Sequence, residues 1–123
     1  MKADEIENLA KSIVKFLGCN KPVDVYWNAD INYSFAVAKR GTHRKMIVFG
    51  TYLLIKDDFF QSYIAAHEAA HVVVSDKYGK KHGHDKVFKT AERAALKSIG
   101  LDIEYANIYA KDLKFFGKTV FSR

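Results

Sequence analysis

Two histidines and a glutamate inside an almost wholly apolar helix constrain this fold more than any other feature. The stretch from residue 58 to about residue 78 has the length and spacing of one helix. Apolar residues surround its axis on nearly every side, so we expect this helix to be buried. The polar exceptions at its centre are His67, Glu68 and His71. Because buried polar side chains require partners, this trio calls for a metal ion or a tight hydrogen-bond network.

The helix boundaries carry their own signals. Asp57 and Asp58 precede the apolar stretch, and we expect Asp58 to cap the helix, with Gln61 completing a variant of the capping box. Gly18 is suited to the position just past the end of an earlier helix. Asp85 is suited to cap a later one.

The remaining elements follow from hydrophobic periodicity and turn residues. The sequence predicts one helix before the strands and one after the buried helix, at residues 4–17 and 85–100. It predicts three short strands, at residues 23–27, 35–39 and 46–49, the last two joined as a hairpin. This order indicates a small α+β domain, in which a three-stranded meander packs on helices. The tail beyond Leu101 is ambiguous, because 105–116 could form a helix.

Length and composition limit what the chain can be. Its 123 residues predict a single domain over 1–123, with a formal net charge of +6. One cysteine, Cys19, excludes a disulfide framework and a four-cysteine zinc ribbon. No stretch reaches the roughly 18 consecutive apolar residues of a membrane span, and the N-terminus has no signal-peptide pattern. We therefore expect a cytoplasmic protein, with the monomer favoured.

The spacing His67-Glu68-Ala69-Ala70-His71 suits metal-assisted hydrolysis. Histidines four residues apart on a helix share a face, so both imidazoles can reach one ion. Glu68 lies about 100° further around the helix and can hold a metal-bound water without itself binding the metal. Zinc lowers the pKa of that water to about 7, and a nearby carboxylate can take its proton as it attacks a carbonyl. The sequence therefore predicts one catalytic zinc per chain.

A catalytic zinc site uses three protein ligands and leaves one position for water. Two histidines follow the buried helix at a suitable distance, His82 and His84, in a loop that can turn back toward it. The spacing alone leaves both open as the third ligand.

The segment Gly83-His84-Asp85-Lys86-Val87-Phe88, coming after the His67–His71 pattern, resembles the SprT-like (Spartan-type) zinc metallopeptidases over residues 33–95. That resemblance implies a zincin-like fold, peptide-bond hydrolysis with Glu68 as general base, and zinc held by His67, His71 and His84. It favours His84 over His82, because an aromatic residue, Phe88, follows His84 by four positions. The chain has no C-terminal zinc ribbon, so the family's action on DNA-bound proteins is a weaker expectation.

A basic face on the last helix provides an alternative interpretation. The side chains that share this face are Lys86, Lys89, Arg93 and Lys97. They could bind DNA, although a solvated helix face is the simpler interpretation. The rival function is thus a nucleic-acid-binding module with a structural or vestigial zinc site, and a zinc hydrolase of small amides is a third.

Two further expectations concern the substrate. The strand at residues 46–49 could be an edge that pairs with an extended peptide, or a purely structural strand. Three tyrosines could polarise the scissile carbonyl, and the sequence does not select among Tyr52, Tyr105 and Tyr109.

Overall fold

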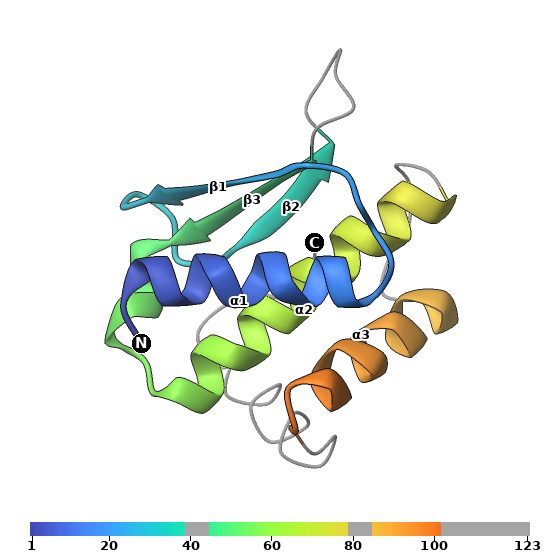
Figure 1. Cartoon of the computed structure of the whole chain (residues 1–123). Coiled ribbons are helices and arrows are strands. Elements are labelled where there is room, and N and C mark those ends of the chain that lie inside the picture. The colour runs from blue at the N-terminus through green and yellow to red at the C-terminus, as the bar shows by residue number, and fades with distance from the viewer. Residues whose placement is uncertain (39–44, 79–84, 102–123) are drawn as a thin grey trace.

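The computed structural model describes residues 1–38, 45–78 and 85–101 (Figure 1). The elements follow in the order α1 (Ala3–Phe16), β1 (Val23–Asn28), β2 (Phe35–Ala38), β3 (Lys45–Gly50), the 3-10 helix η1 (Thr51–Ile55), α2 (Asp58–Tyr78) and α3 (Lys86–Ser98). α2 packs against the sheet, against α1 and against α3 (Figure 1). The predicted α+β class is confirmed, with α2 at the centre of the fold.

Two of the predicted helix boundaries are confirmed. Gly18 follows the C-cap of α1 with a φ of +94°, a left-handed conformation that favours glycine. Asp85 caps α3, because its Oδ1 accepts a hydrogen bond from the backbone N–H of Phe88 at 2.9 Å.

The predicted cap of α2 was wrong by one residue. Asp57, rather than Asp58, accepts the hydrogen bond from a first-turn N–H, that of Phe60 at 2.8 Å. The side chain of Gln61 has other partners, because its Oε1 accepts from the N-terminal ammonium of Met1 at 2.7 Å and its Nε2 donates to the carbonyl of Leu53 at 3.0 Å. The two adjacent aspartates satisfy the same capping pattern, and the helix uses the first of them.

The sheet is mixed, so the predicted meander was wrong. Its order is β1-β3-β2, with β1 parallel to β3 and β2 antiparallel to it. The predicted hairpin is confirmed, since Phe35 pairs with Val48 and Ala38 with Lys45. A meander would place β2 in the middle, but the continuous apolar run of β3 takes that place. Strands buried on both faces have this composition, whereas β1 alternates and leaves Tyr26 exposed.

The central place of β3 also contradicts its suggested role as a peptide-binding edge. Both of its sides pair with neighbouring strands, so its backbone groups are already used in the sheet. Within the described residues, the edges are β1 and β2. Any strand addition to this sheet would have to take place there.

The expected burial of α2 is confirmed. Ten consecutive residues of this helix, from Tyr63 to Val72, are buried. No helix in the described part of the chain is both long and apolar enough to cross a membrane. The neighbours that bury α2 are α1, α3 and the sheet.

Candidate metal site

The polar trio of α2 lies inside the fold. The exposed fraction is 1% for His67, 0% for Glu68 and 4% for His71. The two imidazole centroids are 4.9 Å apart, with their planes at 83°. The four-residue spacing therefore has the expected consequence, since both rings come to the same side of α2.

The donor atoms of this trio gather in one place. One ligand atom from each of His67, Glu68 and His71 lies within 4.8 Å of the other two. Two nitrogen ligands on one zinc are at most ~4.2 Å apart, because each Zn–N bond is ~2.1 Å long. The 4.8 Å limit exceeds this separation by ~0.6 Å, so the side chains would draw slightly closer to bind one ion, and imidazole and carboxylate are donors that zinc accepts. This buried His-Glu-His group could hold a metal ion.

Phe88, in the first turn of α3, packs on both imidazoles. Its ring stacks on His71 with centroids 4.2 Å apart and planes at 27°, and meets His67 edge-on at 5.1 Å and 74°. The ring is 1% exposed. The aromatic residue that follows His84 by four positions thus forms one wall around the two histidines.

Glu92, one helical turn beyond Phe88, was not identified from the sequence. Its Oε2 lies 2.5 Å from Nδ1 of His67, and the hydroxyl of Tyr63 donates to the same oxygen at 3.4 Å. A carboxylate only accepts hydrogen bonds, so the imidazole donates its Nδ1–H. The signal that could have revealed Glu92 is its four-residue spacing from Phe88, which places it on the apolar side of α3.

Burial raises the pKa of two tyrosines near this group. It raises the pKa of Tyr63 far above its ordinary value, and the Glu92 carboxylate raises it further, so the hydroxyl stays a donor. Burial is also the main cause that raises the pKa of Tyr52 to about 12, with a contribution from the charge of Glu68. Of the three tyrosines suggested from the sequence, only Tyr52 lies in the described residues, and Tyr105 and Tyr109 lie outside them.

Both candidates for the third ligand, His82 and His84, lie outside the described residues. Asp85 is the first residue described after them, and it caps the helix that carries Phe88. The choice between the two histidines stays a prediction.

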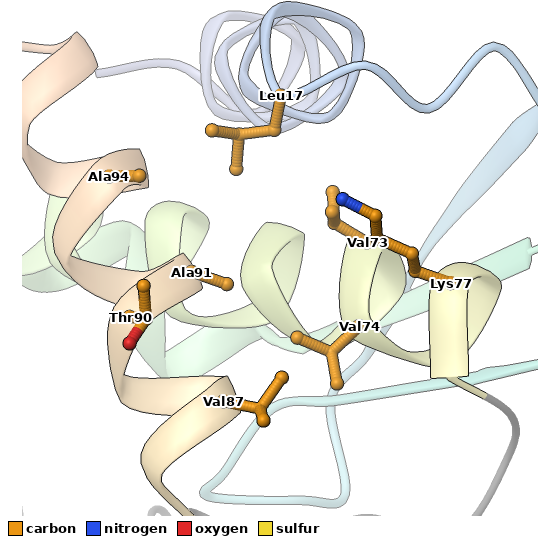
Figure 2. A pocket seen from close by; sticks show the side chains of 8 residues that line it. All are labelled: Leu17, Val73, Val74, Lys77, Val87, Thr90, Ala91 and Ala94. Atoms are coloured by element: carbon orange, nitrogen blue, oxygen red, sulfur yellow. The ribbon is translucent and has the colours of Figure 1, made fainter.

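An apolar groove of about 310 Å³ lies between α1, α2 and α3 (Figure 2). Leu17, the C-cap residue of α1, points into it, and Val74 and Val87 approach it from α2 and α3 (Figure 2). Neither histidine of the trio lines it, and neither does Glu68. The groove is therefore separate from the candidate metal site, although α2 and α3 contribute residues to the surroundings of both.

The basic side chains of α3 face away from the site. All four of them, Lys86, Lys89, Arg93 and Lys97, are exposed. The first three share a surface hollow of about 360 Å³ with Asp85 and Thr90. This arrangement agrees with a solvated face and leaves the cations accessible to a polyanion.

Comparison with models of known protein families, with curated proteins and with solved structures finds no match to this chain. The functional argument therefore rests on the residues themselves and on their geometry. Its firmest part is the buried group of potential metal donors on α2.

Proposed function

We propose that this protein is a zinc-dependent endopeptidase of the SprT-like type. The observation that carries the proposal is the buried group of His67, Glu68 and His71, whose ligand atoms lie within 4.8 Å of one another. The two imidazoles stand one helical turn apart, and the carboxylate beside them is that of the residue next to the first histidine. This combination of donor and neighbouring base is the one that metal-assisted hydrolysis requires.

His67 and His71 would bind the metal, with His84 as the third ligand. When bound, zinc polarises a carbonyl and lowers the pKa of water to about 7. His84 immediately precedes Asp85, the cap of α3, and Phe88 in the first turn of that helix contacts both imidazoles. The chain therefore enters α3 close to the site, which favours a ligand just before the cap.

Glu68 would act as the general base and transfer a proton during hydrolysis. Its carboxylate would accept a proton from the attacking water and then deliver it to the leaving amine. The complete burial of Glu68 suits this role, because a carboxylate shielded from bulk solvent would exchange its proton with the attacking water and the leaving amine rather than with the solvent. The matched variant Glu68→Gln keeps the size of the side chain and removes its basicity.

One observation favours the rival function, a nucleic-acid-binding module with a structural zinc. None of the three polar residues is more than 4% exposed. A structural zinc site is closed by protein ligands, whereas a catalytic one keeps a position for water. In the rival, the exposed cations of α3 would bind DNA, and Glu68 could itself be a zinc ligand.

The two functions are distinguished by zinc content together with proteolysis. We would measure zinc by elemental analysis in the wild type, Glu68→Gln, His84→Ala and His82→Ala. The endopeptidase predicts about one zinc in the wild type and in Glu68→Gln, with loss in His84→Ala and retention in the matched control His82→Ala. Cleavage of a protein substrate, assayed with and without single-stranded DNA, should fall at least ~100-fold in Glu68→Gln.

Other outcomes identify which part of the proposal fails. Zinc lost from Glu68→Gln would make Glu68 a ligand and favour the structural site. Zinc lost from His82→Ala but kept in His84→Ala would transfer the third-ligand role to His82. A wild-type protein that binds no zinc would contradict the endopeptidase and favour a nucleic-acid-binding module with a vestigial zinc site.

A further inference from the structure

Glu92 reaches across from α3 to a histidine that the mechanism needs. Its Oε2 lies 2.5 Å from Nδ1 of His67, and the Tyr63 hydroxyl donates to the same oxygen at 3.4 Å. The His67 side chain is 1% exposed, whereas that of Glu92 is 18% exposed. One carboxylate oxygen thus joins two buried side chains of α2 that lie one helical turn apart.

We propose that Glu92 is a positioning residue, which orients His67 for metal binding. A neutral imidazole carries one N–H, and a carboxylate can only accept it. With the proton held at Nδ1, the lone pair of the other nitrogen, Nε2, is left as the metal ligand. This inference rests on the proposed metal site and adds a residue that the sequence pattern does not contain.

The hydrogen bond does more than select the tautomer. It fixes the rotation of the ring, and Phe88 limits the same rotation by its edge-on contact at 5.1 Å. A carboxylate that accepts from a metal-binding histidine also makes the imidazole a stronger donor to the metal. Groups in this position typically contribute a factor of ~10–100 to metal affinity or activity.

Glu92 itself does not belong to the group of donors. The ligand atoms that gather within 4.8 Å come from His67, Glu68 and His71. Glu92 approaches the site through the ring nitrogen of His67. The geometry therefore separates a positioning role from a ligand role, and the two roles predict different effects on metal affinity.

The first experiment reads the tautomer of His67 in the metal-free protein. We would record long-range ¹H–¹⁵N NMR spectra of the histidine rings at a pH where the ring is neutral. The wild type should carry its proton at Nδ1 of His67, and Glu92→Ala should lose that preference. Glu92→Gln should keep part of it, because the amide oxygen can accept the same hydrogen bond.

The second experiment measures zinc affinity by competition with a chromophoric chelator. Glu92→Ala should bind zinc ~10–100-fold more weakly than the wild type, with partial recovery in Glu92→Gln. Glu7→Ala is the matched control, since it removes a partly exposed carboxylate from α1 and should leave both readouts unchanged. Circular dichroism of each metal-free variant checks that it is folded.

The outcomes separate this inference from the proposed function. An unchanged tautomer in a folded Glu92→Ala protein would overturn the positioning role, whatever happens to zinc binding. A loss of affinity well beyond 100-fold that Glu92→Gln does not relieve would instead make Glu92 a ligand. A wild type that binds no zinc would remove the metal site, while the tautomer experiment would still decide whether Glu92 orients His67.

Discussion

The two faces of α3 differ in what they do with their polar groups. The inner face presents Phe88 and Glu92 to the imidazoles of α2, and the Glu92 carboxylate accepts hydrogen bonds from two buried side chains. The outer face carries exposed cations, including Lys89 and Arg93. A charge on the outer face can be exchanged for another with little consequence, whereas a charge on the inner face has a particular partner. A lone carboxylate on an apolar helix face therefore identifies a site more sharply than a row of charges on a solvated face.

The largest expected effect comes from removing the aromatic ring of the inner face. Phe88→Ala should lower the free energy of unfolding by about 3–5 kcal/mol, as other buried aromatic-to-alanine changes do. The ring is 1% exposed and packs with Ala70 and Val74 as well as with the imidazoles. Urea denaturation of the metal-free protein measures this cost directly.

Phe88→Leu is the matched control for that prediction. It keeps most of the buried volume but loses the flat ring that stacks on His71 at 4.2 Å. We expect a smaller loss of stability than in Phe88→Ala, because the cavity is smaller. If Phe88→Ala cost less than about 1 kcal/mol, an amount typical of a surface position, the inner face would not be the packed wall described above.

Much of the site was predictable because its chemistry is local in sequence. The spacing of His67, Glu68 and His71 depends on a single helix, and helical periodicity predicts that they share a buried region. Glu92 was missed because its role depends on how α3 packs against α2. In the sequence it stands among lysines and an arginine, where a carboxylate resembles one more member of a charged surface.

The same difference between local signals and long-range packing explains which parts of the fold were predictable. The bounds of α1 and α3 and the β2–β3 hairpin were predictable, because caps, periods and tight turns are local signals. The parallel pairing of β1 with β3 was not, because it joins strands that are not consecutive in the chain. The continuous apolar run of β3 is the signal in the sequence for a central strand. It argues against the meander, in which β2 would be central and would pair with β1.

A moderate effect is expected at the N-cap, where the two faces of α3 meet. Asp85 lines the outer hollow, and its carboxylate accepts from the N–H of Phe88 on the inner face at 2.9 Å. Asp85→Ala should cost about 1 kcal/mol of unfolding free energy, while Asp85→Asn should cost much less because asparagine caps nearly as well. Thermal melts of both variants test this, and equal losses would assign the effect to the charge of Asp85 rather than to its cap.

The smallest effects are expected on the outer face of α3. Lys89→Ala and Arg93→Ala should each change the unfolding free energy by no more than about 0.5 kcal/mol, because both side chains are exposed. If this face binds duplex DNA, each substitution should also reduce the slope of log affinity against log salt by ~0.9, which fluorescence anisotropy can measure. A loss of stability above about 1 kcal/mol would show that these cations have structural partners. In that case the two faces of α3 would not differ in whether their charged side chains have structural partners.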